Sequence, residues 1–233
     1  MDRKTFEQHL DTNPFEQLSK IVYKMLKNDI LSFKLEPGTK INTTQIATDL
    51  EISRTPVKEA VKFLHEDGLL ETYPEKNGYY VYTMSRSSME DLYFARSIIE
   101  SNATYHCALK KNNIDLKLLR ELAEEFQDMF AEQDFSRIDE LDPVFHRIIV
   151  ESTKNQYLIK MYESIETMIA YHNGRTRRVL QMTSIGQFAQ TVATQHIMIC
   201  NAIEFGVPEI ARDAARSHVE STIDFIRRNM EAY

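Results

Sequence analysis

Ile52-Ser-Arg-Thr-Pro-Val-Lys-Glu-Ala60 is the stretch of sequence that decides the fold of the N-terminal part of the chain. Ser53 is a residue type that caps helices, because its hydroxyl can accept a hydrogen bond from a backbone N–H. Pro56 is tolerated in the first turn of a helix, where the N–H groups have no partners within the helix. Val57 begins an apolar stripe at positions i, i+4 and i+7. The stretch therefore predicts the start of a helix that packs on a preceding one.

Three polar residues of the same stretch belong to the first turn and a half of this helix. Arg54 and Lys58 carry positive charge, and the hydroxyl of Thr55 can donate or accept a hydrogen bond. In a helix-turn-helix this part of the second helix meets base edges and phosphates. The stretch indicates the start of a DNA recognition helix.

The neighbouring sequence completes a winged helix-turn-helix, with helical periodicity before the motif and β-forming residues after it. Gly and Pro mark the turns between these segments. The elements that we expect are a helix over residues 14–31, a turn at 36–38, a helix from Asn42 or Thr43, the recognition helix up to Asp67-Gly68, and strands at 69–73 and 79–83 joined by a hairpin at 74–78.

The rest of the chain has a different composition. Between Tyr79 and Asn173 there is no Gly and one Pro, Pro143, so the second half should be almost entirely helical. The expected fold class is mainly α, with an N-terminal winged helix-turn-helix and a C-terminal six-helix bundle. Six helices are expected at 88–110, 114–133, 135–152, 155–178, 182–205 and 208–231. The expected divisions are a tail at 1–13, the winged domain at 14–83, a linker at 84–88 and the bundle at 89–233.

Composition excludes several other classes of protein. No apolar run is long enough for a transmembrane helix, and the polar N-terminus does not resemble a signal peptide. Cys107 and Cys200 are too few for a disulfide framework, and we expect buried free thiols in a reducing cytoplasm. The net charge of −7 gives no general preference for nucleic acid, so the placement of the basic residues matters.

The motifs in the run from Ile30 to Val81 resemble the N-terminal domain of GntR-family bacterial transcription regulators. The resemblance rests on Leu35-Glu-Pro-Gly38, Ser53-Arg-Thr-Pro-Val-Lys-Glu-Ala60, Leu64-His-Glu-Asp-Gly-Leu69 and Asn77-Gly-Tyr-Tyr-Val81. Lys58 stands where that family usually has Arg, and Thr44 where some members have a DNA-contacting Arg. Lys retains a phosphate contact but loses bidentate base recognition. The DNA-binding residues that we expect are Thr44, Ser53, Arg54, Thr55, Lys58, Asn77 and Gly78.

Four residues of the bundle have the spacing of a metal site. Asp142 and His146 are at i and i+4, which places them on one helix face. His196 and His218 lie eleven residues on either side of Val207, so an antiparallel helix pair would hold both imidazoles at one level. Such a set suits a divalent metal inside a bundle. Two simpler interpretations remain open: the histidines could be hydrogen-bonded core residues, and Asp142 could be an N-cap before Pro143.

These positions also resemble a second family. Asp142-Pro-Val-Phe-His146, Gln195-His196 and Ser217-His218 are similar to the FCD domain of FadR-type GntR regulators. In the metal-binding members of that family, one Asp and three His hold the ion. The resemblance implies that Asp142, His146, His196 and His218 bind a divalent metal ion. Three imidazoles and one carboxylate suit Zn²⁺, Ni²⁺ or Mn²⁺.

Arg96 lies on a predicted helix face with Leu92, Ile99 and Ala103, so it should point into the bundle. One interpretation is an ion pair with Glu100 at i+4. The other is a guanidinium that binds a carboxylate with two hydrogen bonds. An Arg at this place in the FCD family resembles an effector contact.

The leading hypothesis is a cytoplasmic regulator, not an enzyme, that binds a palindromic DNA operator as a homodimer and responds to a small organic acid. One alternative is a metal-dependent hydrolase fused to a DNA-binding module. Catalytic zinc usually has three protein ligands and an open position for water, whereas four ligands are proposed here and no Glu or His has a clear general-base placement near them. Another is a regulator whose metal is purely structural.

Overall fold

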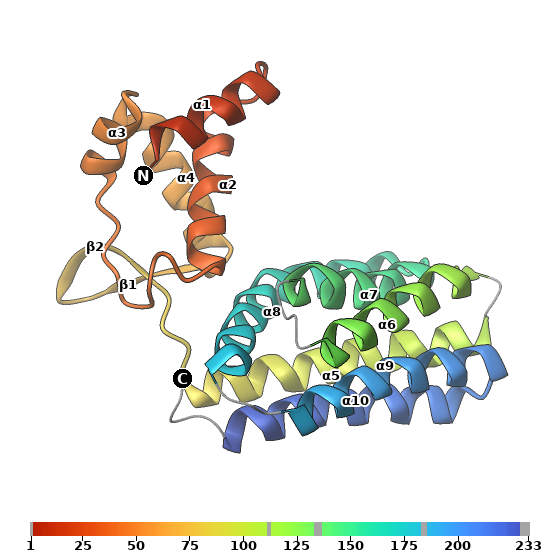
Figure 1. Cartoon of the computed structure of the whole chain (residues 1–233). Helices are drawn as coiled ribbons and strands as arrows, with labels where there is room; N and C mark the ends of the chain where they lie inside the picture. Colours follow the sequence, from red (N-terminus) through yellow and green to blue (C-terminus); the bar gives the residue numbers. More distant parts are fainter. Residues whose placement is uncertain (1, 111–112, 133–136, 183–185, 229–233) are drawn as a thin grey trace. The chain divides into compact units, whose positions relative to one another are not determined.

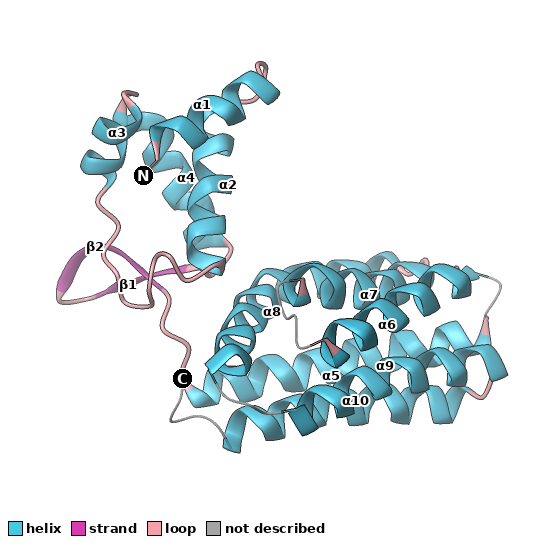
Figure 2. Ribbon diagram, in the orientation of Figure 1, coloured by secondary structure: helices cyan, strands magenta, loops and turns pink. Residues whose placement is uncertain are grey.

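The computed structural model describes residues 2–110, 113–132, 137–182 and 186–228. The chain divides into two compact units, Met1–Met84 and Ser85–Tyr233. Helices dominate both units, and the only strands in the described residues belong to the first unit (Figures 1 and 2). The mainly α fold class is confirmed.

The first unit is a winged helix-turn-helix, as expected. Helix α4 packs against α2, α3 and β1. Its apolar stripe, Val57, Val61 and Leu64, is fully buried, because this face meets the preceding helices. The elements are α1 (Arg3–Thr12), α2 (Leu18–Leu31), α3 (Thr43–Leu50), α4 (Arg54–Glu66), β1 (Leu70–Tyr73) and β2 (Lys76–Val81).

The largest differences from the expected boundaries in this unit are the starts of α2 and β2; β2 also ends at Val81 instead of residue 83. Helix α2 begins at Leu18 and not at Pro14, and Phe15 is fully exposed. Strand β2 begins at Lys76, where it pairs with Tyr73, so the hairpin turn is shorter than residues 74–78. Apolar periodicity marks where a helix can bury a face, but it does not locate the residue at which the helix begins.

Residues 1–13, expected as a tail, contain helix α1. The side chain of Asp2 caps this helix by accepting hydrogen bonds from the backbone N–H groups of Lys4 and Thr5. Phe6 is buried, and α1 contacts α2 and α3. Arg3 donates a hydrogen bond to the carbonyl of Leu50 at the end of α3. A single buried apolar residue gives too weak a periodicity for the helix to be recognised from the sequence.

The second unit is a six-helix bundle. Helix α5 contacts α7, α8, α9 and α10, so it lies in the middle of the bundle (Figure 1). Phe145, Ile149 and Ile199 are among the buried core residues that fill the space between these helices. The helices are α5 (Arg86–Leu109), α6 (Leu116–Ala131), α7 (Ile138–Ser152), α8 (Gln156–Met182), α9 (Gly186–Phe205) and α10 (Pro208–Arg228).

In the second unit the structure differs from one expectation and decides against one interpretation that the sequence left open. The expected linker at 84–88 contains the beginning of α5, because Ser85 caps that helix through a hydrogen bond from the Ser88 N–H. Asp142 is not an N-cap, since α7 begins at Ile138 and Pro143 lies inside it. The side chain of Asp142 is therefore available for contacts with other helices. No helix among the described residues is long and apolar enough to cross a membrane.

Candidate functional site

The candidate DNA-binding residues of the helix-turn-helix are all exposed. Thr44 lies in the first turn of α3, and Ser53, Arg54, Thr55 and Lys58 lie at the start of α4. The buried stripe of α4 fixes this helix against the unit, which leaves its polar N-terminal part open to solvent. The geometry agrees with the presentation of a recognition helix.

Ser53 is at the N-cap position of α4, but the expected side-chain cap is wrong: its side chain makes no capping hydrogen bond. Pro56 is the third residue of the helix and has no N–H, so one of the donors that a capping hydroxyl normally uses is missing. The Ser53 hydroxyl is thus not occupied in stabilising the helix end.

The hairpin of the winged motif carries a small basic and aromatic surface. Asn77 and Gly78 are exposed. The ammonium groups of Lys40 and Lys76 each lie 5.8 Å from the centre of the Tyr80 ring. Gly78 has φ of +106°, and a Cβ there would lie 3.2 Å from Cε of Lys40. A side chain at position 78 would therefore strain the hairpin and displace a cation.

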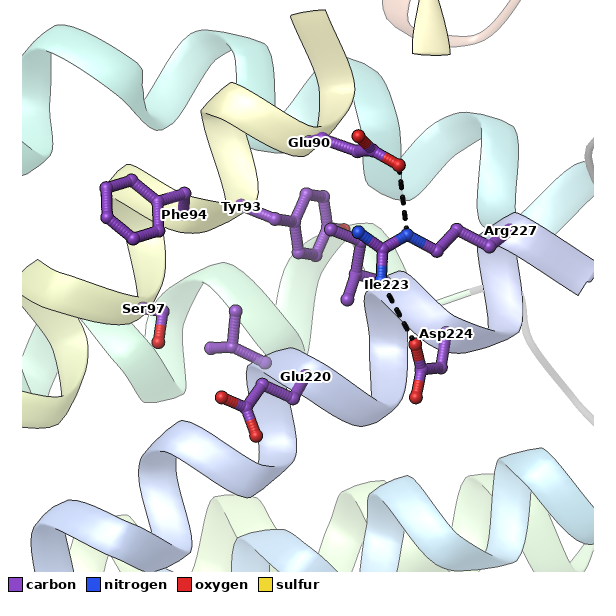
Figure 3. A pocket seen from close by; sticks show the side chains of 9 residues that line it. Glu90, Tyr93, Phe94, Ser97, Glu220, Ile223, Asp224 and Arg227 are labelled. Carbon is purple, nitrogen blue, oxygen red and sulfur yellow. Dashed lines mark hydrogen bonds and ion pairs between the residues drawn. The ribbon is translucent and has the colours of Figure 1, made fainter. Parts of the chain in front are cut away.

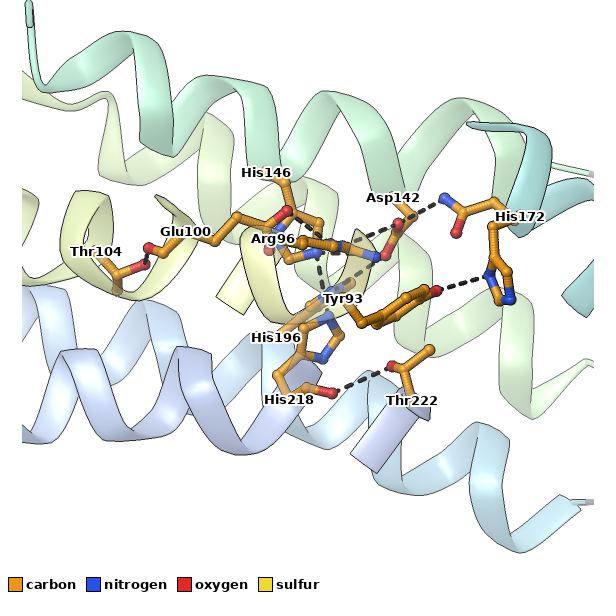
Figure 4. A network of polar contacts seen from close by, with 11 residues as sticks. Tyr93, Arg96, Glu100, Thr104, Asp142, His146, His172, His196, His218 and Thr222 are labelled. Carbon is orange, nitrogen blue, oxygen red and sulfur yellow. Dashed lines mark hydrogen bonds and ion pairs between the residues drawn. The ribbon is translucent and has the colours of Figure 1, made fainter. Parts of the chain in front are cut away.

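In the second unit, the four expected metal ligands are brought together. Asp142, His146, His196 and His218 are all buried, and one ligand atom from each lies within 4.8 Å of the others. Asp142 Oδ1 is 3.4 Å from His146 Nε2 and 3.6 Å from His196 Nε2. The Nε2 atoms of His146 and His218 are 3.2 Å apart. Figure 4 shows the side chains converging from α7, α9 and α10.

Unpartnered nitrogen atoms favour a ligand set over a hydrogen-bonded core. Neither ring nitrogen of His196 has a hydrogen-bond partner among the described residues, and neither has Nδ1 of His218. Buried polar atoms without partners are rare, because each one loses its hydrogen bonds to water. Neutral imidazoles and a carboxylate are the donors that borderline divalent ions prefer. The cluster can hold a metal ion.

The protonation states differ within the cluster. Burial lowers the pKa of His196 to about 3, and burial together with the other two histidines lowers that of His218 well below its ordinary value. Burial also opposes protonation of His146, but the carboxylates of Glu100 and Asp142 raise its pKa. Burial disfavours the charge of Asp142 as well, yet His146 and Arg96 lower its pKa. His196 and His218 are therefore neutral, as metal binding requires.

Arg96 is buried beside the cluster and makes the ion pair that was one of its two interpretations. Its Nε donates a hydrogen bond to Glu100 Oε1 at 2.7 Å. Its Nη2 lies 3.6 Å from Asp142 Oδ2, which is too long for a hydrogen bond, and has no hydrogen-bond partner among the described residues. The Nε donor of Arg96 is thus already used by Glu100, so only the remaining donors of the guanidinium could bind an incoming carboxylate.

The sequence did not predict three further contacts around the cluster. Glu100 Oε2 lies 3.0 Å from His146 Nδ1. Asn173 on α8 donates a hydrogen bond to Asp142 Oδ2 at 2.8 Å, which leaves Oδ1 toward the imidazoles. His172, interpreted as structural, is buried with its Nδ1 2.7 Å from the Tyr93 hydroxyl. In the sequence, the only indication of these polar contacts was that Arg96 and Glu100 lie on the same inward face of the predicted helix.

A groove of about 370 Å³ lies between α5 and α10 (Figure 3). Arg227 spans it and donates hydrogen bonds to Glu90 at 3.0 Å and Asp224 at 3.4 Å. Tyr93 lines this groove and also takes part in the buried network of Figure 4. The groove and the buried network thus share the side chain of Tyr93.

Comparison with known proteins agrees with both halves of the chain. Residues 18–81 match the family described as bacterial regulatory proteins, gntR family, and residues 91–221 match the FCD domain. The uncharacterized HTH-type transcriptional regulator YdhC of Bacillus subtilis is 24% identical over 90% of this chain and 91% of its own length. The Nta operon transcriptional regulator of Aminobacter aminovorans is 30% identical over 60% of this chain and 66% of its own length.

A solved structure of a GntR transcriptional regulator from Rhodococcus sp. RHA1 has the same fold. Its TM-score is 0.73, at 20% identity, and the match covers 92% of this chain and 98% of that one. These families and relatives are transcription regulators and not enzymes, which removes the hydrolase alternative. The chain belongs to the GntR family of transcription regulators, with a gntR-type DNA-binding domain followed by an FCD domain.

Proposed function

We propose that this regulator, a member of the FadR subfamily, binds a palindromic operator as a homodimer, and that a small carboxylate metabolite bound at a metal site in the second unit controls its affinity for DNA. The observation that carries the proposal is the buried cluster of Asp142, His146, His196 and His218, whose ligand atoms lie within 4.8 Å of one another. A buried set of imidazoles of which His196 and His218 keep nitrogens without hydrogen-bond partners among the described residues has no evident purpose in a core that apolar side chains could fill.

The donor set supports Zn²⁺, Ni²⁺ or Mn²⁺ as the bound ion, because imidazole and carboxylate ligands suit these borderline ions. The ion would supply a Lewis acid that binds an oxygen of the metabolite. The protein's own contribution is to keep His196 and His218 neutral by burial and to hold Asp142 through Asn173.

The charge balance supports an anionic effector. When the imidazoles are neutral, the positive charge of a divalent ion and Arg96 exceeds the negative charge of Asp142 and Glu100. Burial makes such an excess costly, so an anion is attracted and a cationic metabolite is not. Nη2 of Arg96 is the donor available to a second acid group, since Nε is held by Glu100.

Seven exposed residues of the first unit support recognition of DNA. They lie on α3 (Thr44), on or just before α4 (Ser53, Arg54, Thr55 and Lys58) and on the hairpin (Asn77 and Gly78). One winged domain reads a half-site, so specific binding requires two copies. The effector changes operator affinity only if it binds the two arrangements of the dimer with different affinities.

A thermal-shift screen tests the effector. Zn²⁺-loaded wild type, His196→Ala and Arg96→Lys proteins are each mixed with lactate, malate, citrate and gluconate. Lys keeps the positive charge that the buried carboxylates need, so this variant should fold. The expected result is an acid that stabilises the wild type and has a smaller or no effect on both variants. An acid that stabilises all three proteins equally would contradict binding at this site.

Removal of the ion separates this proposal from a purely structural metal. After treatment with EDTA, a sensory site predicts that far-UV circular dichroism is unchanged and that the thermal shift with the acid disappears. A structural ion predicts loss of helicity together with loss of operator binding.

A further inference from the structure

Glu100 is a buried carboxylate that the proposed metal site does not use as a ligand. It is 2% exposed, on the face of α5 that meets α7. A carboxylate in such a position is stable only when its charge and its lone pairs are matched by nearby donors. Its two oxygens face different partners: Oε1 accepts the hydrogen bond from Arg96 Nε at 2.7 Å, and Oε2 has no hydrogen bond of standard geometry among the described residues but lies 3.0 Å from His146 Nδ1, within ion-pair distance (Figure 4).

We propose that Glu100 is the positioning residue that prepares His146 for the metal while holding Arg96 away from the metal ligand Asp142. This inference rests on the proposed function, because it assumes that the cluster binds an ion. The inference has two parts: Glu100 determines which nitrogen of His146 faces the metal ion, and it limits how strongly Arg96 competes with the ion for Asp142.

The first part follows from imidazole chemistry. A neutral imidazole carries its proton on one nitrogen and offers the other as a ligand. Glu100 Oε2 can only accept a hydrogen bond, so it favours the proton on Nδ1 of His146. Nε2 is then the unprotonated atom, and it is Nε2 that faces Asp142 Oδ1 at 3.4 Å and His218 Nε2 at 3.2 Å. Outer partners of this kind fix the orientation of metal-binding histidines.

The second part follows from the position of Arg96. Its Nη2 already lies 3.6 Å from Asp142 Oδ2. A guanidinium released from Glu100 would have Asp142 as its nearest carboxylate among the ion pairs described, and would compete there with a divalent ion. By accepting the Nε hydrogen bond, Glu100 keeps the Asp142 contact of Arg96 long. One carboxylate thus serves both the ligand histidine and the arginine.

Substitution by Gln breaks this arrangement in a specific way. An amide has one acceptor oxygen and one NH₂ donor, and Arg96 is always a donor. The amide oxygen therefore turns to Arg96 and the NH₂ turns to His146. Nδ1 of His146 must then accept, which moves the proton of the neutral ring to Nε2, the atom that should bind the metal.

The experiment is a double-mutant cycle on the full chain: wild type, Glu100→Gln, Arg96→Leu and the double variant. The readout is Zn²⁺ affinity in competition with a chromophoric chelator, with helicity checked by circular dichroism. Glu100→Gln should weaken Zn²⁺ binding about 10–100-fold. In the double variant the amide oxygen is free to turn to His146, so affinity should recover toward that of Arg96→Leu. Glu166→Gln, which alters an ion pair with Arg147 outside the cluster, is the matched control and should bind like wild type.

Different outcomes separate this inference from the proposed function. If wild type and the control bind no Zn²⁺, the metal site and this inference both fail. If wild type binds Zn²⁺ and a folded Glu100→Gln variant binds it equally tightly, only the role of Glu100 fails. A purely structural role predicts that the double variant binds no better than Glu100→Gln.

A measurement on the wild type covers the case in which the variants do not fold. Long-range ¹H–¹⁵N spectra of the Zn²⁺-loaded protein report which nitrogen of His146 carries the proton. The inference predicts a slowly exchanging proton on Nδ1, and metal bound through Nδ1 would overturn it.

Discussion

The Nε2 atoms of His146 on α7 and His218 on α10 lie 3.2 Å apart in the interior of the bundle. At this distance one nitrogen can donate to the other, but two lone pairs would repel each other and two protons would collide. A neutral imidazole carries one N–H, so either ring can supply the proton that joins the two nitrogens. A divalent ion could replace that proton and satisfy both lone pairs.

This relationship predicts that Zn²⁺ stabilises the folded chain through His218. An ion that binds only the native state adds about 2.7 kcal/mol to the free energy of unfolding when its concentration is a hundred times Kd. Calorimetry should show the melting temperature of wild type rising with Zn²⁺, and a much smaller rise for His218→Ala. His65→Ala, which removes an exposed imidazole of the first unit, is the control and should respond like wild type. An equal rise in all three proteins would place the ion elsewhere.

Arg54 should be the dominant base contact of the recognition helix. Its side chain is exposed at the first residue of α4, where a guanidinium can reach a base edge. Arg54→Ala should cost about 1–3 kcal/mol on a selected operator and relax its sequence preference. Lys58→Ala should weaken all sequences alike and reduce the salt dependence of binding. Fluorescence anisotropy at fixed salt, with operator and scrambled DNA, measures both effects. Unchanged operator binding by Arg54→Ala would show that the contact is assigned to the wrong residue.

The meeting of Asp142, His146, His196 and His218 could be predicted because local geometry determines most of it. Asp142 and His146 share a helix face by their spacing of four. His196 and His218 meet because both lie the same number of residues from one helix turn, and their ring centres are 4.6 Å apart. The surrounding contacts depend instead on how α5 and α8 pack against α7, which spacing within a single helix does not describe.

Arg96 shows the same limit at a single residue. The sequence placed its side chain inside the bundle but left two interpretations open. Burial decides between them, because a guanidinium and a carboxylate that are both removed from water must pair. The positions of Asp142 and His146 beside that pair then follow from tertiary packing.

The two thiols should be unreactive in the native protein. Burial raises the pKa of Cys107 to about 12. Burial is also the largest cause of the raised pKa of Cys200, which is about 12. At pH 8 the reactive thiolate is therefore scarce, and both sulfur atoms are shielded from reagent. Ellman's reagent should modify neither thiol within minutes in buffer, and both rapidly in guanidinium chloride. Fast modification of either thiol in a fully folded sample would contradict its burial.

Phe6 and Phe15 provide a matched test of helix α1. The two residues are of the same type and lie nine positions apart in the sequence, but Phe6 is 1% exposed and Phe15 is 100% exposed. Removal of a buried Phe side chain costs about 3–5 kcal/mol, because apolar contacts are lost and a cavity remains. Phe6→Ala should therefore destabilise the first unit by that order, and Phe15→Ala should change its stability by less than about 0.5 kcal/mol. Native-state hydrogen exchange of the amides in α2 and α4 reports the stability of this unit separately from that of the bundle.

If α1 does not pack on α2 and α3, the two substitutions will have equally small effects. If it does, Phe6→Ala should also weaken operator binding, because the same helix contacts the end of α3 through Arg3.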